Sequence, residues 1–419
     1  MKKLLISLTT AAFVFITTCS QATLILYEPF DYPVGDRLGG SVTASATNVV
    51  GKIAPNGQQW IVRSPANQTN YSLARDVAIT NGSLSYPGLV PSKGNAVRYG
   101  SGISNNPTLY TDAIAIPGGP YLSGSLYYSM IVHLHSAIPS GGARTCYAAF
   151  SEDTANPVTD AGVGVITSSG TANTALPAGA WIRNSGTTQY QLGGGKQNGD
   201  GLGTSASWPS WQAAGALPNQ QGNTAGATQD WATIDSNPAQ PYFIVMKYTY
   251  NSGSSSDDTV SMWVNPVAAT LGYDGGEWLA GLAGGSYYSA TNAYTTANID
   301  ANYFGIQSFL LLGNAQASAS FTKTIDVTLD ELRIGTTWAD VTPLPLPQII
   351  SIAGAGTTSV TVTWTNVQFG TNYVLQYNTN VVTATWSNLA PVAAAGTTTS
   401  QTDNPPAGAA ARFYRVLKP

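Results

Sequence analysis

The stretch that decides the fold class is Ile325-Asp326-Val327-Thr328-Leu329-Asp330-Glu331-Leu332-Arg333-Ile334-Gly335-Thr336-Thr337-Trp338-Ala339-Asp340-Val341. Apolar residues occupy alternate positions over much of it, which is the period of a half-buried β-strand. We interpret the whole stretch as one long strand that closes a large all-β domain. Alternating runs of the same kind occur at residues 126–135, 144–150, 242–250, 259–264 and 303–312.

These runs outnumber helical patterns, because no segment has the apolar spacing of an amphipathic helix of ordinary length. The runs at 242–250 and 259–264 flank a polar, glycine-containing segment and are expected to form a hairpin. Many strands with few helices favour two stacked sheets.

The composition limits the classes of function. Charged residues make up 9% of the chain and the net charge is −4, without a basic stripe that could bind phosphate backbones. A nucleic-acid partner is therefore excluded. With 43% hydrophobic and 10% aromatic residues, the chain is too apolar and too weakly charged for wholesale disorder.

The N-terminus has the pattern of a secretory signal peptide. Lys2 and Lys3 precede the apolar run of residues 4–16, and cleavage is expected after Ala22. A retained membrane anchor and a lipid anchor on Cys19 are the less favoured alternatives, because the run is short and threonines precede the cysteine. We therefore expect a secreted or cell-surface protein without a transmembrane segment after cleavage, with the periplasm as an alternative.

Cleavage would leave Cys146 as the one cysteine, which rules out an internal disulfide. Its place in the apolar run 144–150 favours a buried thiol that packs as a small hydrophobe. A catalytic thiol is less favoured, because no cation is near it in the sequence.

The chain divides into a signal peptide (1–22), a large domain (23–341), a linker (342–347) and a small C-terminal module (348–419). Residues 167–237, rich in Gly, Ala, Thr, Asn and Gln, are interpreted as a long insertion. Alternating prolines make the linker extended and semi-rigid. The module holds short alternating runs and ends just after the last of them, which leaves the predicted sandwich one edge strand short.

Four places in the large domain resemble the concanavalin A-like (laminin G-type) jelly roll of secreted bacterial surface proteins. They are the opening run at residues 26–35, the strand around 125–129, the run ending in Asn-Pro at 258–266, and the stretch quoted first. Residues 348–419 resemble a fibronectin type III-like module, with Trp364 and Tyr373 at its core positions. The resemblance implies two β-sandwiches, and it transfers a scaffold rather than a site.

Laminarinase-type glucanases of the jelly-roll family carry paired carboxylates about 5 to 5.5 Å apart. This chain lacks their Ile-Asp-x-x-Glu pattern, and an extended Asp330-Glu331 would point to opposite sheet faces. Asp326 and Asp330 share a face, but their Cα atoms would lie about 13 Å apart. No catalytic residue is predicted.

His133 and His135 form a His-x-His pair on one strand face. This spacing can chelate zinc or copper when a third ligand converges, but no further histidine exists. A hydrogen-bonded or exposed pair is favoured. In the resembled family the concave sheet face commonly holds sugars, so the imidazoles are also candidates to bind hydroxyl groups.

Tryptophans in polar or glycine-rich surroundings are the other candidate ligand-binding residues. Trp208 and Trp211 flank a proline that would stiffen a stacking platform for sugar rings, and Trp231 is a third candidate. The alternative is that these indoles pin long loops to the sandwich. Five further tryptophans are expected in the cores: Trp60, Trp263, Trp338, Trp364 and Trp386.

Calcium is the remaining ion to consider, because many concanavalin A-like domains hold one with oxygen ligands. The candidate ligands are Asp257, Asp258, Asp326 and Asp330. The strict EF-hand pattern is absent, and solvated turn carboxylates explain the first two equally well. No cofactor is required.

We therefore expect a non-catalytic, exported β-sandwich protein that binds a glycan or cell-surface polysaccharide or mediates adhesion. The alternatives are an extracellular polysaccharide-degrading enzyme, either hydrolase or lyase, on the same fold, and a purely structural envelope protein.

Overall fold

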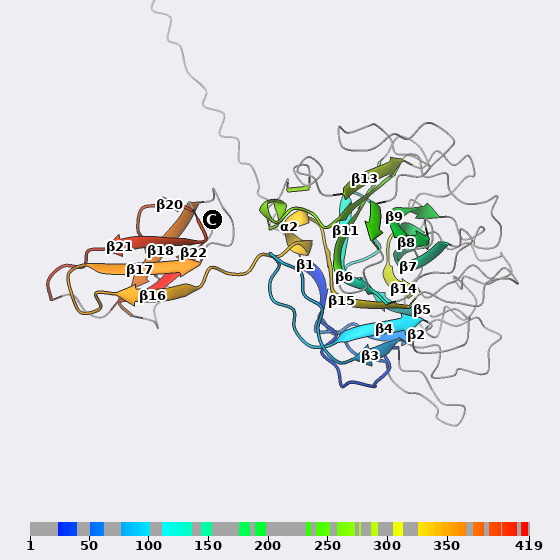
Figure 1. Ribbon diagram of the computed structural model, residues 1–419, viewed down its shortest axis with the longest axis horizontal. Helices are drawn as coiled ribbons and strands as arrows, with labels where there is room; N and C mark the ends of the chain where they lie inside the picture. Colours follow the sequence, from blue (N-terminus) through cyan, green and yellow to red (C-terminus); the bar gives the residue numbers. More distant parts are fainter. Residues whose placement is uncertain are drawn as a thin grey trace, which may run out of the picture.

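The computed structural model describes much of the chain after the predicted signal peptide (Figure 1). The described residues are 24–39, 51–62, 77–100, 111–135, 144–152, 176–184, 189–197, 232–235, 240–251, 258–272, 276–277, 286–291, 305–312, 326–365, 372–380, 385–394, 396–408 and 412–417. They are mostly β-strands, so the all-β prediction is confirmed.

The large domain is a jelly-roll sandwich of two antiparallel sheets. In the described residues the first sheet has eight strands in the order β13-β12-β11-β6-β15-β4-β3, with β1 also paired to β15. Its strands are β1 (Leu24–Glu28), β3 (Ala78–Thr80), β4 (Ala96–Gly100), β6 (Ser125–Leu134), β11 (Tyr242–Thr249), β12 (Thr259–Val264), β13 (Ser286–Thr291) and β15 (Asp326–Gly335). The expected hairpin is confirmed, because β11 and β12 pair antiparallel from Ile244 and Val264 to Thr249 and Thr259.

The second sheet has seven strands within the described residues, in the order β10-β9-β8-β7-β14-β5-β2. They are β2 (Trp60–Val62), β5 (Thr111–Ala115), β7 (Arg144–Ser151), β8 (Leu176–Asn184), β9 (Gln189–Gln197), β10 (Ala232–Asp235) and β14 (Ser308–Leu312). Three of them, β8 to β10, lie inside the segment that was interpreted as an insertion, so that segment contributes to the sheet.

Tight packing explains the glycine at position 194 of β9. A Cβ atom built on Gly194 would lie 2.7 Å from Cε of Met246 and 3.1 Å from Cβ of Met262, both on the first sheet. A larger side chain would therefore clash with the facing sheet. A glycine in place of an apolar residue interrupts the alternation by which a strand is recognised in a sequence.

The main core fills the space between the two sheets. Tyr128 of β6 makes edge-to-face contacts with Phe150 and Phe309 of the second sheet, at centroid distances of 4.9 and 5.0 Å. The five residues predicted to share the inner face of β6 are all buried: Leu126, Tyr128, Met130, Val132 and Leu134. This alternation confirms the predicted face of β6.

The outer face of the first sheet is also buried over its centre, whereas the pattern predicted a half-buried strand. Tyr127 and Ile131 of β6 belong to a second apolar cluster with Trp263 and Trp338. The two indoles meet edge to face with ring centroids 5.1 Å apart. The covering side chains come from residues 84–90, from Leu271 just after the 3-10 helix η3 (Ala268–Thr270), and from the end of the large domain.

The quoted stretch is a strand only as far as Gly335. The short helix α2 (Trp338–Val341) follows it, so the prediction of one continuous strand is wrong for the last residues. Thr337 and Asp340 form a capping box: the Thr337 hydroxyl accepts from the Asp340 N–H, and the Asp340 carboxylate accepts from the Thr337 N–H at 2.9 Å. This pattern was visible in the sequence.

The C-terminal residues form a small sandwich with its own core (Figure 1). The three-stranded sheet β16-β17-β21 faces a sheet in which β18 pairs with β19, β20 and β22. The strands are β16 (Ile349–Ala353), β17 (Val360–Thr365), β18 (Asn372–Asn378), β19 (Ser387–Asn388), β20 (Val392–Ala393), β21 (Thr398–Asp403) and β22 (Phe413–Leu417). Trp364 and Tyr373 are fully buried in this core.

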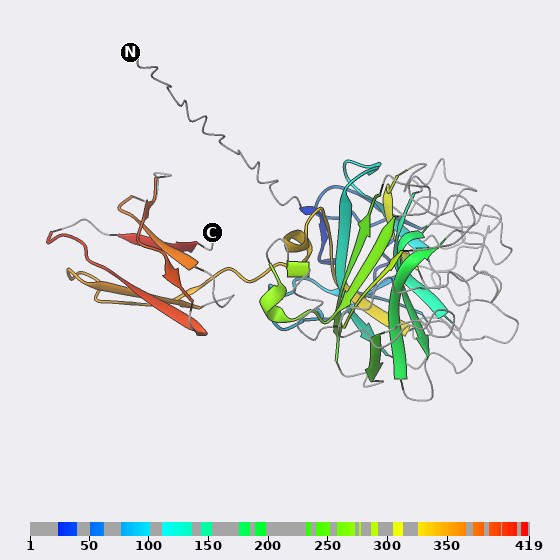
Figure 2. The same ribbon diagram turned by 90° about the horizontal axis from the view of Figure 1, so that it is seen from above.

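A single segment joins the two bodies, as both views show (Figure 2). Residues 343–348 form no strand or helix. The cores on the two sides share no residue. The exact domain limits at 341 and 348 stay a prediction.

Candidate functional site

The predicted histidine pair lies at the end of β6, on the outer face of the first sheet. His133 is opposite Thr328 of β15, and Thr328 is in turn opposite Arg98 of β4. The three residues therefore form one row across three neighbouring strands. His135 directly follows β6, and its N–H donates to the carbonyl of Asp326 at 3.0 Å. We call Arg98, Asp326, Thr328, His133 and His135 the histidine cluster.

Side-chain contacts hold the histidine cluster in one arrangement. The imidazole rings of His133 and His135 lie 4.5 Å apart, centroid to centroid, at 51°. The His135 Nε2 atom and the Thr328 hydroxyl are hydrogen-bonded at 2.6 Å. Strands carry four of the five residues, and the main chain of His135 is hydrogen-bonded to β15, so the sheet fixes their positions.

Arg98 and Asp326 form a two-pronged ion pair beside the imidazoles. Arg98 donates from Nε to Oδ1 at 2.9 Å and from Nη2 to Oδ2 at 2.8 Å. This planar geometry is the strong form of such a pair. The Asp326 side chain is 7% exposed and the Arg98 side chain 31%, so the guanidinium group keeps contact with solvent.

The environment favours the uncharged form of both imidazoles. Partial burial lowers the pKa of His133, and the positive charge of Arg98 lowers it further. Burial, Arg98 and His133 lower the pKa of His135 in the same direction. Since the Arg98 and Asp326 charges offset each other, the histidine cluster has no net charge. It offers hydrogen-bond donors and acceptors rather than an ionic field.

The candidate calcium ligands do not come together. Asp258 is buried at the end of the β11–β12 hairpin, where its carboxylate accepts from the Tyr248 hydroxyl at 2.5 Å and the Asn251 N–H at 2.6 Å. Asp326 is paired with Arg98, and Asp330 contacts a different segment. Within the described ranges, no group of three or more His, Cys, Asp or Glu side chains could hold a metal ion. The calcium hypothesis stays a prediction, and Asp257 lies outside the described residues.

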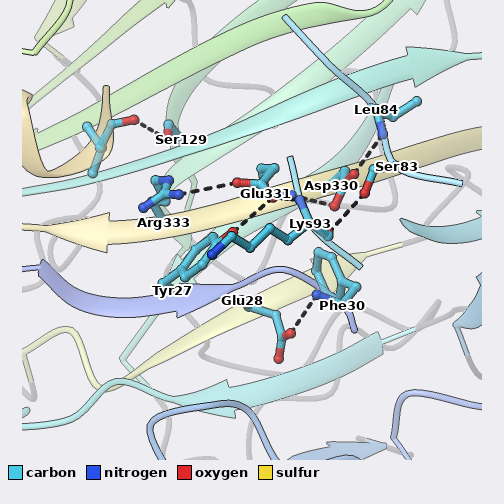
Figure 3. Close-up of polar contacts among 11 residues, drawn as sticks. Tyr27, Glu28, Phe30, Ser83, Leu84, Lys93, Ser129, Asp330, Glu331 and Arg333 are labelled. Atoms are coloured by element: carbon cyan, nitrogen blue, oxygen red, sulfur yellow. Dashed lines mark hydrogen bonds and ion pairs between the residues drawn. The ribbon is translucent and has the colours of Figure 1, made fainter. Parts of the chain in front are cut away.

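A β-bulge in β15 lets the adjacent residues Asp330 and Glu331 both contact residues 83–93, which the sequence analysis did not predict (Figure 3). Glu331 has φ of +55°, so the alternation of an extended strand is broken there. The Asp330 carboxylate accepts from the Leu84 N–H at 2.7 Å, and the Glu331 carboxylate accepts from the Lys93 N–H at 2.9 Å. Both carboxylates thus anchor residues 83–93 over the outer face.

The contacts of this carboxylate pair are structural in kind. Glu331 also accepts from the Tyr27 hydroxyl at 3.0 Å and lies 3.3 Å from Nη2 of Arg333 (Figure 3). Burial is the main cause that raises the pKa of Asp330, to about 8, and the charge of Glu331 adds to the effect. Asp330 is completely buried and Glu331 nearly so. The pair holds the fold together and is not placed on an open surface.

The tryptophan predictions have mixed outcomes. Trp208, Trp211 and Trp231 lie outside the described residues and stay predictions. Four of the five expected core tryptophans are buried: Trp60, Trp263, Trp338 and Trp364. Trp386 is half-buried, because the Arg415 guanidinium lies over its ring at 4.3 Å.

Comparisons with known proteins identify no family. No family model matches the chain, and no curated protein matches it. A solved GH131 β-glucanase catalytic domain from Podospora anserina is similar at 10% identity, with 76% of this chain and 99% of that chain covered and a TM-score of 0.33.

Two further solved structures are similar at the same level. A PL-14 alginate lyase from Aplysia kurodai has 9% identity, coverage of 62% and 86%, and a TM-score of 0.32. Domain 4 of a GH43 arabinanase from Geobacillus stearothermophilus has 13% identity, coverage of 77% and 98%, and a TM-score of 0.31. At these values the similarities carry no argument about ligand or chemistry.

No membrane-crossing helix occurs in the parts of the chain that the structure describes. The predicted signal peptide lies outside those parts. Cys146 is buried and its thiol contacts the carbonyl of Ala148 at 3.4 Å. The prediction of a buried thiol is therefore confirmed.

Proposed function

We propose that the protein is an exported, non-catalytic carbohydrate-binding or adhesion protein whose large sandwich contacts a glycan through the histidine cluster. In this proposal the sandwich is of the concanavalin A-like (laminin G-type) kind and the C-terminal module is fibronectin type III-like. The observation that carries it is the pair of neutral imidazoles fixed beside a charge-compensated Arg98–Asp326 pair.

The chemistry of these groups matches that of sugar hydroxyls. Neutral imidazole both donates and accepts a hydrogen bond, and Arg98 adds further N–H donors. A surface without net charge attracts a phosphate only weakly, whereas the hydroxyl groups of a polyol can pair with both donors and acceptors. Strand-borne groups also lose little conformational freedom on binding, which lowers the cost of association.

The test is binding of the mature chain, residues 23–419, to a glycan array and, by calorimetry, to soluble polysaccharides. We expect His133→Ala and His135→Ala to weaken binding at least tenfold. His135→Gln should retain most of it, because an amide can still bond to the Thr328 hydroxyl. Gln59→Ala, an exposed change on the second sheet's side, serves as the matched control.

Each outcome has a distinct meaning. Binding that survives both alanine variants would remove the histidine cluster from the proposal, and absence of binding to every glycan would remove the function. Repeating the titration with EDTA tests the calcium hypothesis. New reducing ends or unsaturated products from laminarin, alginate, agar or xylan would replace the proposal with the enzymatic alternative.

A further inference from the structure

The two sheets of the small C-terminal sandwich have outer faces of different chemistry. On the sheet β16-β17-β21 the hydroxyl groups of Thr361 and Thr402 are hydrogen-bonded at 3.0 Å. Those of Thr363 and Ser400 are hydrogen-bonded at 2.7 Å beside them. Such cross-strand hydroxyl pairs are ordinary for a solvated sheet face. The outer face formed by β18, β19 and β22 has long amide, guanidinium and aromatic side chains instead.

Three of these side chains form a hydrogen-bonded row across the three strands. Leu375 is in the core, so the next residue, Gln376, is on the outer face. It lies opposite Arg415 of β22 and Asn388 of β19. The Arg415 Nε atom donates to Oε1 of Gln376 at 2.6 Å, and Nε2 of Gln376 donates to Oδ1 of Asn388. We call Arg415, Gln376 and Asn388 the polar row; its groups are held in place before a ligand arrives, which lowers the cost of binding.

Aromatic and apolar side chains border the polar row. The guanidinium carbon of Arg415 lies over the Trp386 ring, 4.3 Å from its centroid. This stacking fixes the plane of the guanidinium group. Phe413 and Leu417, two positions before and after Arg415 on the same face of β22, are 42% and 39% exposed. The face therefore joins ordered hydrogen-bonding groups to exposed apolar surface, and a sugar unit presents both hydroxyl groups and C–H groups.

The charge of Arg415 is not balanced by an acid on this face. Residues 348–419 contain three basic residues, Arg412, Arg415 and Lys418, and one acid, Asp403, which gives a formal charge of +2. Asp403 is buried and accepts from Arg412 and from the Tyr414 hydroxyl. Among the described residues Arg415 forms no ion pair, and its Nη atoms donate to none of them. These two atoms are the edge with which a guanidinium group holds a carboxylate by two parallel hydrogen bonds.

We propose that the outer face of β18, β19 and β22 is a second glycan site, which binds an acidic sugar unit with its anionic group on the Nη atoms of Arg415. Hydroxyl groups of the sugar would pair with the exposed amide of Asn388, and its C–H groups would pack on Phe413 and Leu417. A uronate carboxylate and a sulfate ester share the required chemistry. The inference rests on the proposed function in taking the ligand to be a glycan, but it assigns a separate site with a preference for charge. Two sites on one chain would raise the avidity for a long polymer.

The test is calorimetric titration of the mature chain, residues 23–419, with a galacturonate oligomer, a sulfated dextran and a neutral dextran. We expect Arg415→Gln to lower the affinity for the galacturonate oligomer about tenfold and to leave that for neutral dextran unchanged. Arg415→Lys keeps the charge without the planar pair of donors, so it should restore the affinity only in part. Thr402→Ala, on the outer face of the other sheet, is the matched control and should bind as the wild type does. An Arg415 effect confined to the sulfated dextran would identify the anionic group as a sulfate ester.

Two results would overturn the proposal. The first is that wild type and Arg415→Gln have equal affinity for both acidic polymers or bind neither. The second is equally tight, Arg415-dependent binding of poly-glutamate, which would assign the face to acidic polypeptides. The variants His133→Ala and His135→Ala separate the two sites, because they should leave the difference made by Arg415→Gln in place. If these histidine variants bind every glycan as the wild type does, the histidine cluster is refuted while the second site stands.

Discussion

The buried carboxyl group of Asp330 makes stability depend on pH in a direction opposite to that of most carboxylates. Asp330→Asn is the informative change, because an amide resembles the protonated acid in size and in having one acceptor and one donating side. Asp330 accepts from the Leu84 and Glu331 N–H groups at 2.7 Å each, and its neighbour Glu331 shares the same anchored segment (Figure 3).

The magnitude follows from the pKa. Burial raises the pKa of Asp330 from an ordinary 3.8 to about 8. The folded state therefore keeps a proton that the unfolded state releases above pH 3.8. The stabilising contribution is complete below that pH, declines as the pH rises and is lost above about 8. At 1.36 kcal/mol per pKa unit the upper limit is about 6 kcal/mol, and structural relaxation makes about 2 to 3 kcal/mol the expected change.

The assay is urea unfolding of both proteins at pH 5, 6, 7, 8 and 9, followed by circular dichroism and tryptophan fluorescence. We expect the difference in unfolding free energy, wild type minus Asp330→Asn, to fall steadily from pH 5 to pH 8 and then level off. Asp31→Asn, on an exposed residue, is the matched control. A pH-independent difference for Asp330→Asn would refute the reasoning.

Three further outcomes are expected. Glu28→Gln should lower the unfolding free energy, measured with urea, by about 2 to 3 kcal/mol. The buried carboxylate accepts hydrogen bonds from the Phe30 N–H, the Tyr32 hydroxyl and the Trp60 indole, whereas an amide has only one acceptor oxygen. Burial raises the pKa of the Cys146 thiol, so Ellman's reagent should modify it only in denaturant; fast reaction of the native protein would contradict this burial. If the histidine cluster binds glycan, calorimetric affinity should be constant from pH 7 to 8 and fall in acid, since protonation adds charge beside Arg98; equal affinity at pH 5 would argue against it.

The sequence was most predictive for strand faces that pack against the core between the two sheets. The alternation from Leu126 to Leu134 correctly assigned the inner face of β6, because side-chain direction in a strand is a local property. The same alternation could not show that Tyr127 and Ile131 are covered from outside. Their cover comes from segments far away in the sequence.

The sequence predicted the candidate site only in part. His-x-His spacing located the imidazoles, but Arg98 lies 35 positions before His133 and Asp326 far after it, so only strand pairing could bring them together. Nothing in the sequence around Glu331 distinguishes the bulge from an ordinary strand position. Gly194 of β9 was misread for a different reason: glycine usually indicates a loop, but here it allows a close contact between the two sheets.

The anchoring of the linker has a mechanical consequence. Leu24 of β1 is paired with Gly335 of β15, so the first strand and the exit toward the module lie at the same end of the sheet. Tension between them would open this strand pair like a zipper, one bond at a time. In contrast, the Ser129 hydroxyl donates to the carbonyl of Val341 at 2.6 Å, and the Val90 N–H donates to that of Pro343 at 3.0 Å. A force on the C-terminal module is therefore transmitted in part to β6, in the middle of the sheet, before it reaches the β1–β15 strand pair.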